Sequence, residues 1–293
     1  MGRIEPIAAA MAAAALLHAY IAARIFLWPL AALLLTSAAL SALSPMAVNR
    51  RMTFLAHAQS HSILTASLSA AVTTALLKIS WFSPYFTLVV IAYTIALNLL
   101  VLLVARSGFK EDVATGIVMS FQLAATIFLI YVLRSLVSTS LDPLALFTGE
   151  YLLITSSDVI QLAPVLAATS LFVALAGVPF LYIALDREYA SSLGLRPTLY
   201  EVLFIIAMSS AAAVSVNVMG ALIPAVVLVV PGAAAAKTTQ SLVRQIPTAS
   251  SYGVISASVS HFIYAELPWM WPNVAVALVL LAILLYSIRP LTR

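Results

Sequence analysis

Long hydrophobic runs, separated by short stretches that carry charge, proline or glycine, extend along almost the whole chain. A helix that crosses a bilayer needs about 20 consecutive apolar residues, and ten segments approach this requirement. They lie near residues 7–25, 28–47, 53–78, 85–105, 112–137, 158–184, 198–216, 218–236, 252–266 and 271–288. The pattern therefore predicts an all-α protein, a polytopic integral membrane bundle of about 9–10 transmembrane helices.

Two of these predicted spans are unusual. The ninth, near residues 252–266, is short, which favours a tilted or partly embedded helix. The eighth contains Pro224 and Pro231. Proline removes a backbone donor, so we expect the eighth span to be kinked or broken at mid-membrane depth.

Composition agrees with a bilayer protein and excludes several kinds of site. Hydrophobic residues make up 63% of the 293 residues and charged residues only 8%. Cysteine is absent, which excludes disulfides and thiolate metal ligands. The net charge of +4 is too small to indicate a nucleic-acid partner. No G-x-x-x-x-G-K-[ST] sequence is present, so we do not expect this chain to hydrolyse ATP. We also expect that the chain is not an enzyme and binds no permanent cofactor.

The distribution of basic residues predicts the orientation in the membrane. Placing Arg50 and Arg51 in the cytoplasm puts most other lysines and arginines there, and leaves Arg24, Lys78 and Arg134 on or near the outer side. Ten spans then leave both termini in the cytoplasm. The expected location is the plasma membrane, as a multi-pass protein.

Two histidines one helical turn apart, His57 and His61, stand out on the third predicted span. An ionisable side chain is costly to bury in a bilayer and usually has a function there. Residues at i and i+4 share one helix face, so both imidazoles can point into one cavity and form half of a metal site. Alternatively, both rings hydrogen-bond to neighbouring helices. These two residues alone leave both interpretations open.

Other polar residues in the predicted spans give weaker signals. His261, with Glu266 nearby, is a further candidate metal ligand, although a packed, hydrogen-bonded histidine is the favoured interpretation. Glu201 lies near the start of a span, where a helix N-terminus favours a carboxylate for structural reasons. Three lone polar residues are expected to bond to neighbouring helices: Asn98, Gln122 and Asn217.

Five segments carry more specific sequence patterns. They read RRMTFLAHAQSHSIL at 50–64, LALFTGEYLLITSSDVI at 144–160, LDREYASSLGLRP at 185–197, VMGALIPAVVLVVPGAAAA at 218–236 and ELPWMWPNVAVALVLLAILL at 266–285. In this order, and over roughly residues 28–290, they resemble the membrane permease subunits of ABC importers for zinc, manganese and iron(II). Two of the five matches fall in polar loops, where a chance match of apolar residues is not the explanation.

The resemblance implies a homodimeric ABC importer permease fold over residues 28–293, with residues 1–27 as an additional N-terminal transmembrane helix. It implies two further partners: an ATP-binding subunit, which uses the ATP, and an extracellular metal-binding protein, which delivers the ion. The segment 186–197 reads as a short helix ended by Gly194 and stopped by Pro197. By resemblance it is the coupling segment that docks on the ATP-binding subunit, with candidate residues Asp186, Arg187, Glu188, Ala190, Gly194 and Arg196. Asp158 matches the family's outer motif and is a further candidate metal ligand at the outer mouth, or a helix cap.

One departure from the family pattern concerns the metal. His57 stands where the family usually has the acid of an acid-x-x-x-His pair. An imidazole in place of a carboxylate removes a negative charge and softens the site, which disfavours manganese relative to zinc, nickel, copper or iron(II). We therefore expect transport of a divalent metal ion, with zinc first and manganese or iron(II) as alternatives.

Other functions stay open. A secondary transporter driven by an ion gradient would use the histidines as proton carriers, but it predicts paired broken helices, and the sequence shows one. The same fold could also carry a chelated metal. An intramembrane metalloenzyme is disfavoured because the residues between the two histidines, Ala58, Gln59 and Ser60, lack the glutamate of H-E-x-x-H.

Overall fold

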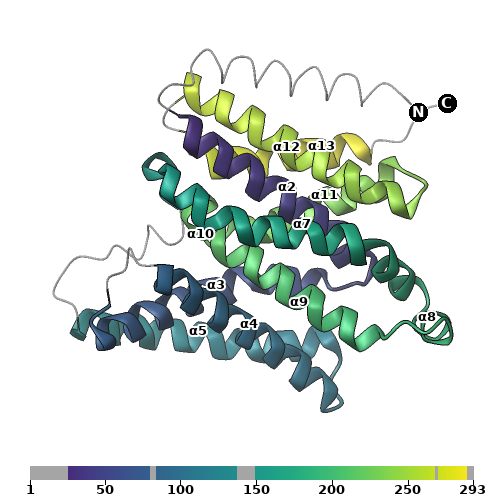
Figure 1. Cartoon of the computed structure of the whole chain (residues 1–293), viewed down its shortest axis with the longest axis horizontal. Coiled ribbons are helices and arrows are strands. Elements are labelled where there is room, and N and C mark those ends of the chain that lie inside the picture. The colour runs from purple at the N-terminus through teal and green to yellow at the C-terminus, as the bar shows by residue number, and fades with distance from the viewer. Residues whose placement is uncertain (1–25, 80–83, 137–148, 268–269, 289–293) are drawn as a thin grey trace.

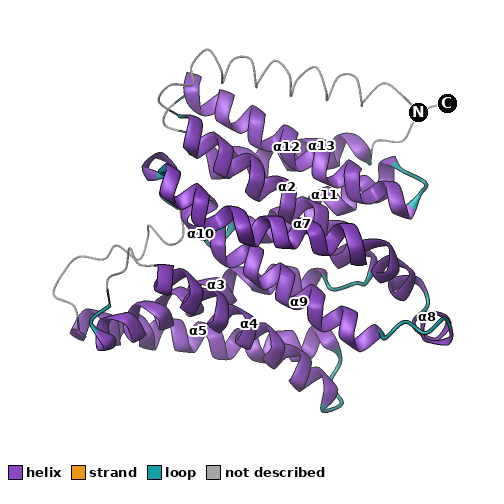
Figure 2. Cartoon of the chain, in the orientation of Figure 1, coloured by secondary structure: helices purple, strands orange, loops and turns teal. Residues whose placement is uncertain are grey.

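The computed structural model of the chain describes residues 26–79, 84–136, 149–267 and 270–288. Within these ranges every regular element is a helix (Figure 2). The helices are α2 (Leu27–Asn49), α3 (Thr53–Leu77), α4 (Pro84–Arg106), α5 (Glu111–Leu136), η1 (Tyr151–Leu153), α7 (Ser156–Leu185), α8 (Arg187–Ser192), α9 (Pro197–Val214), α10 (Val216–Met219), α11 (Ile223–Thr238), α12 (Leu242–Glu266) and α13 (Pro272–Ser287). The prediction of an all-α, polytopic bundle is confirmed.

Six of the described helices are long and apolar enough to cross a membrane: α2, α3, α4, α5, α7 and α9. Helices α11 and α13 are apolar but have 16 residues each, about 24 Å at 1.5 Å per residue. That is shorter than the hydrocarbon core of about 30 Å. The first predicted span, near residues 7–25, lies outside the described residues.

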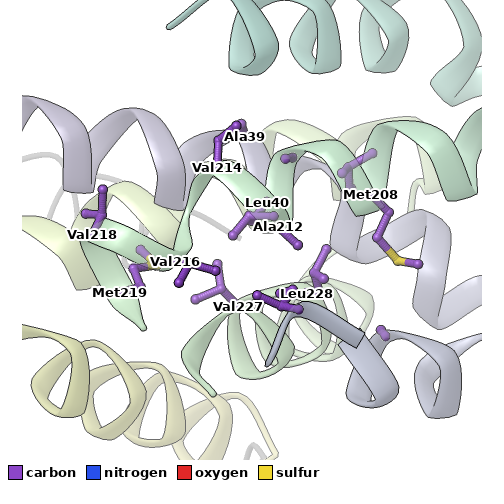
Figure 3. Packing of buried hydrophobic residues seen from close by; sticks show 14 of the residues in the cluster. Ala39, Leu40, Met208, Ala212, Val214, Val216, Val218, Met219, Val227 and Leu228 are labelled. Atoms are coloured by element: carbon purple, nitrogen blue, oxygen red, sulfur yellow. The ribbon is translucent and has the colours of Figure 1, made fainter. Parts of the chain in front are cut away.

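The helices form two groups that share α9 and α11 as neighbours. Helix α2 packs against α7, α11 and α12, and α13 packs against α11 and α12 (Figure 1). Helix α3 packs against α4 and α5, while α9 contacts both α4 and α7, and α11 contacts both α2 and α3. The centre of the core is apolar, and Leu40, Met208 and Leu228 from three different helices are all buried there (Figure 3).

Small residues allow α2 and α11 to approach closely. A Cβ atom added at Gly232 would lie 2.6 Å from the backbone carbonyl of Ser44 on α2. The backbone amide of Gly232 also donates a hydrogen bond of 2.8 Å to Ser44 Oγ. This contact lies one residue after Pro231, and the partner hydroxyl stabilises the backbone there.

The eighth predicted span is broken, but not where its prolines predicted. Pro224 occupies the first turn of α11, where a missing amide costs nothing, and Pro231 lies inside a continuous helix. The chain instead breaks between α10 and α11 at Gly220, whose φ is +72°. A Cβ atom at Gly149 would lie 2.6 Å from the backbone nitrogen of Gly220. The segment that leads into η1 therefore packs directly against the break. Position 149 requires glycine, because a side chain there would clash with the backbone of Gly220.

The ninth predicted span is wrong in length. Helix α12 has 25 residues and begins at Leu242, ten residues before the predicted start. Arg244, Gln245 and Pro247 made its first two turns look like a loop. Pro247 is the sixth residue of α12 and lies inside the helix. The Gln245 side chain is buried and accepts a hydrogen bond of 2.7 Å from Asn49 Nδ2. A tertiary contact thus satisfies a polar group that the sequence pattern assigned to solvent.

Candidate metal pathway and coupling segment

The histidine pair lies on the open side of α3. His57 is exposed and His61 is partly exposed, and Phe54, one turn earlier, is also exposed. The residues on the other sides of the same turns, such as Leu55 and Ala58, are buried. Both imidazoles therefore share one helix face, and that face points out of the bundle formed by a single copy of the chain.

The start of α3 is held by a tight turn from α2. Arg51 has a φ of +60°, in the left-handed region that non-glycine residues rarely adopt. The amide of Met52 donates a hydrogen bond of 2.8 Å to the carbonyl of Ala47. The direction of α3, and with it the direction of the histidine face, is thus set within three residues of the end of α2.

The buried side of α3 carries a network of amides and hydroxyls. Asn98 on α4 accepts a hydrogen bond from Ser62 (3.1 Å) and donates to Gln59 Oε1 (3.2 Å). It also donates to Ser209 Oγ on α9 at 3.0 Å. Gln122 on α5 donates to Ser62 Oγ at 2.9 Å. Asn98 and Gln122 therefore bond to neighbouring helices, as predicted, whereas the side chain of Asn217 lies outside the described part.

His261 faces a different part of the molecule. Its Nδ1 lies 2.8 Å from the hydroxyl of Tyr151 in η1, and its ring makes edge contacts with Phe26 and Tyr151. Among the described residues no group of three or more histidine, aspartate or glutamate side chains could hold a metal ion. The structure does not, therefore, bring His261, Glu266 or Asp158 together with the histidine pair.

Asp158 caps a helix. Its Oδ2 accepts hydrogen bonds from the backbone amide of Thr155 (2.8 Å) and from its hydroxyl (2.7 Å), and the two residues form a capping box at the start of α7. The second of the two roles considered for Asp158 is thus observed. A role at the outer mouth stays a prediction.

The predicted coupling segment, residues 186–197, contains the short helix that its sequence predicted. Asp186 caps α8 by accepting hydrogen bonds from the amides of Glu188 (3.0 Å) and Tyr189 (2.9 Å). Ala190 is fully buried and anchors α8, and Gly194 ends it with a φ of +85°. Pro197 does not simply stop this helix, because it opens α9.

An ion cluster joins the coupling segment to the turn before α3. The Oε1 atom of Glu201 on α9 accepts hydrogen bonds from Arg50 Nη2 (2.8 Å) and Arg187 Nη1 (2.7 Å). Arg50 Nη2 also lies 3.2 Å from Glu111 Oε1 at the start of α5. Burial alone would lower the pKa of the Arg50 guanidinium, but the carboxylates of Glu201 and Glu111 outweigh this effect and raise the pKa above its ordinary value.

The sequence did not predict this cluster. It interpreted Glu201 as a carboxylate at a helix start, but Glu201 is the fifth residue of α9 and lies beyond its first turn. That interpretation also omits both arginines. The available signal was that Arg50, Arg187 and Glu201 were all assigned to the cytoplasmic side. The contacts Asn49–Gln245, Arg50–Glu111 and Arg50–Glu201 place four of the predicted cytoplasmic connections at one end of the bundle.

The fold is that of a polytopic helical membrane permease, with a histidine pair on an open face and a short capped helix at one end. Residues 22–289 match the ABC 3 transport family, and the chain belongs to that family. The resemblance to ABC permeases that the sequence motifs indicated is therefore confirmed.

Individual relatives are distant. The chelated iron transport system membrane protein YfeC of Yersinia pestis is 25% identical over 154 residues, which cover 53% of this chain and 51% of that protein. The manganese import system permease protein ScaB of Streptococcus parasanguinis is 26% identical over 159 residues, which cover 54% and 55%. The matched part of the chain spans about half the length of these curated relatives.

A solved structure resembles the fold over nearly the full chain. PsaBC from Streptococcus pneumoniae, in complex with a Fab, superposes with a TM-score of 0.77 and 20% identity. The alignment covers 94% of this chain and 95% of that chain. At 20% identity, this structural similarity establishes the fold alone.

Proposed function

We propose that this chain is the permease subunit of an ATP-driven importer for a divalent metal ion. It receives the ion from an extracellular binding protein and passes it to the cytoplasm across the plasma membrane. Zinc is the favoured cargo, with manganese or iron(II) as alternatives. The observation that carries the proposal is the pair His57 and His61, one turn apart on the open face of a membrane-spanning helix. Ionisable groups within membrane-spanning segments mark ion pathways.

One copy of the chain supplies only half of a metal site. The described residues bring no third histidine or carboxylate to the pair. Two copies related by a twofold axis would face their α3 helices across a shared pathway and present four imidazoles. Four nitrogen ligands suit tetrahedral zinc, and two with water give the weaker binding that transport requires. We therefore propose a homodimer.

The surface beside the histidine face supports contact with a second copy. Leu222, at the start of α11, is 51% exposed. Its carbonyl accepts a hydrogen bond from Ser60 on α3, so this exposed leucine lies next to the turn that carries the histidines. Phe54, one turn before His57 on the same face, is 43% exposed, and a second copy would cover both apolar side chains.

The energy source is a separate ATP-binding subunit docked at α8. Tyr189 on this short helix and Leu193, the residue that follows it, are 59% and 61% exposed. Exposed apolar side chains on a rigid, capped helix are typical of a contact surface. The six coupling residues, from Asp186 to Arg196, form or flank this surface. In this proposal residues 28–293 are the permease unit and both termini are cytoplasmic.

The test is metal uptake into vesicles that contain this chain, its ATPase subunit and its binding protein. Zinc, manganese and iron(II) are compared with and without ATP. His61→Ala should abolish ATP-dependent uptake because half of the imidazole pair is lost. Ser69→Ala is the matched control, since Ser69 lies two turns further along α3 and bonds only within its own helix.

Three results would contradict parts of this proposal. Uptake that ignores ATP but follows a proton gradient would favour the secondary transporter. Uptake that is equal in His61→Ala and in the unmodified protein would place the pathway elsewhere. Uptake of a metal only as a chelate would move the cargo to the class in the name of the Yersinia pestis relative, a chelated iron.

A further inference from the structure

A single carboxylate oxygen connects the coupling helix with the turn that starts α3. Glu201 Oε1 accepts from Arg187 Nη1 (2.7 Å) and from both Nε (3.0 Å) and Nη2 (2.8 Å) of Arg50. The Glu201 side chain is only 4% exposed. The side chains of Arg50 and Arg187 are 21% and 49% exposed. Charge-assisted bonds to a buried carboxylate are short and directional, so the three side chains move together or the cluster breaks.

Each arginine belongs to a segment that the proposed transport cycle has to move. Arg187 is the first residue of α8, and its Nη2 also donates to Thr198 Oγ1 at 3.2 Å, which adds a second bond between α8 and the start of α9. Arg50 lies in the turn between α2 and α3, seven residues before His57. That separation corresponds to about 10 Å along an ideal helix.

No other route between these two segments is as direct among the described residues. Helix α8 packs mainly against α7 and α9, the helices that flank it in the chain. The end of α2 is fixed separately, because Asn49 Nδ2 bonds to both Pro45 O and Gln245 Oε1 at 2.7 Å. With α2 held in place, a pull on Arg50 acts on the short turn at Arg51 and on the start of α3.

We propose that Glu201 is a positioning residue that transmits a displacement of α8 through Arg50 to the start of α3, and so to the histidine pair. This inference rests on the proposed function, because it assumes that an ATP-binding subunit displaces α8. The carboxylate acts as a shared joint: it follows Arg187 when α8 moves, and Arg50 follows the carboxylate.

If the cluster of Arg50, Glu201 and Arg187 is only a structural clamp that holds the helices together, a different result is expected. Loss of such a clamp lowers stability and reduces ATP hydrolysis and transport in parallel. Loss of the joint leaves α8 docked and the ATPase active, and separates hydrolysis from movement at α3. The number of ATP molecules hydrolysed per ion imported distinguishes the two roles.

The experiment uses the complete transporter in vesicles. Arg187→Met detaches α8 while leaving the Arg50–Glu201 pair intact, and Glu201→Gln keeps the shape of the side chain but removes its charge. Two controls remove equivalent charges elsewhere at the same end: Glu111→Gln, which affects the half-exposed second partner of Arg50, and Arg244→Met, an exposed arginine of α12. Zinc and manganese are the probes for uptake.

The chain contains no cysteine, so one introduced cysteine in each copy can report on α3 directly. Phe54→Cys places a spin label in the first turn of α3, at a position that is exposed in one copy of the chain, and its spectrum is recorded with and without ATP and vanadate. Arg187→Met and Glu201→Gln should suppress the nucleotide-dependent change at this label. They should raise the ATP hydrolysed per imported ion on the order of tenfold, while both controls stay within about twofold.

The outcomes separate the two proposals. An unchanged label response and unchanged ATP use per ion in Arg187→Met would overturn the role of Glu201. Parallel losses of stability, hydrolysis and uptake would also overturn it, in favour of a clamp. The labelled transporter with Arg187 and Glu201 intact could import neither metal and still show the ATP-dependent label response, which Arg187→Met and Glu201→Gln suppress. That result would support the role of Glu201 and contradict the proposed cargo.

Discussion

The two sides of α3 differ in whether one copy of the chain satisfies their polar groups. On the buried side, Gln59 and Ser62 are bonded to Asn98, which in turn bonds to α9. On the open side, His57 and His61 make no side-chain hydrogen bond to any described residue. Polar groups that one copy of the chain satisfies have a structural role. Polar groups that it leaves facing outward are available to an ion or to a second copy.

The largest effect on the buried side is expected from Asn98→Leu. The substitution removes three bonds between helices, and at about 0.6 kcal/mol for each bond inside a membrane the loss is about 2 kcal/mol. Unfolding in detergent, followed by circular dichroism, measures it. Ser209→Ala removes one of the three bonds and should cost about a third as much. Equal losses of stability in the two variants would show that the three hydrogen bonds of Asn98 do not contribute equally to stability.

The next effect concerns the open side. His57→Asp restores the acid found at this position in the resembled family, and a negative oxygen ligand suits manganese better than an imidazole does. The ratio of manganese to zinc uptake should rise on the order of tenfold. His57→Asn is the control of equal size without the charge. A matching rise in His57→Asn would mean that space, not charge, sets the preference.

A smaller effect is expected one turn further along the buried side. Thr126→Val removes the hydroxyl that lies 2.9 Å from Thr65 Oγ1, while Thr65 keeps the carbonyls of His61 and Gln122 as acceptors. The expected loss of stability is about 0.6 kcal/mol, measured as for Asn98→Leu. Loss of metal uptake in this variant without loss of stability would instead assign Thr126 to the pathway.

The smallest effect on stability is expected on the open side, and it distinguishes most clearly between the two sides of α3. His61→Ala should change the free energy of unfolding by less than about 0.5 kcal/mol, because the ring is partly exposed and packs little within one copy. The same variant should abolish uptake. A large loss of stability in the isolated chain would show that His61 is buried polar packing after all, the alternative that the sequence left open.

Sequence patterns predicted helices well wherever a single local rule applies. Asp186, Gly194 and Pro197 mark the limits of α8 and the start of α9 because capping and turn chemistry act within a few residues. The pairing of His57 with His61 on one face follows from helical periodicity alone. Asn98 and Gln122 found the interhelical partners expected of lone amides in a membrane, although the sequence did not identify those partners.

The errors arose where a distant contact changed the local outcome. The start of α12 was missed because Asn49 on α2 satisfies Gln245, a polar residue that looked solvent-exposed. The break before α11 was misplaced because its position depends on the close approach of Gly149 to Gly220, across some seventy residues of sequence. Proline alone was the weaker signal, since both prolines of that segment fit inside a continuous helix.

The sequence by itself determined that the chain is a helical membrane bundle, where most helices begin and end, and which two imidazoles share a face. These properties follow from hydrophobicity and helical periodicity, which are local. Only the tertiary structure decided that this face is the open one and that Glu201 joins Arg50 to Arg187. Each of those facts depends on which residues distant in sequence meet after folding, and a bilayer enforces such meetings because buried polar groups must find partners within the protein.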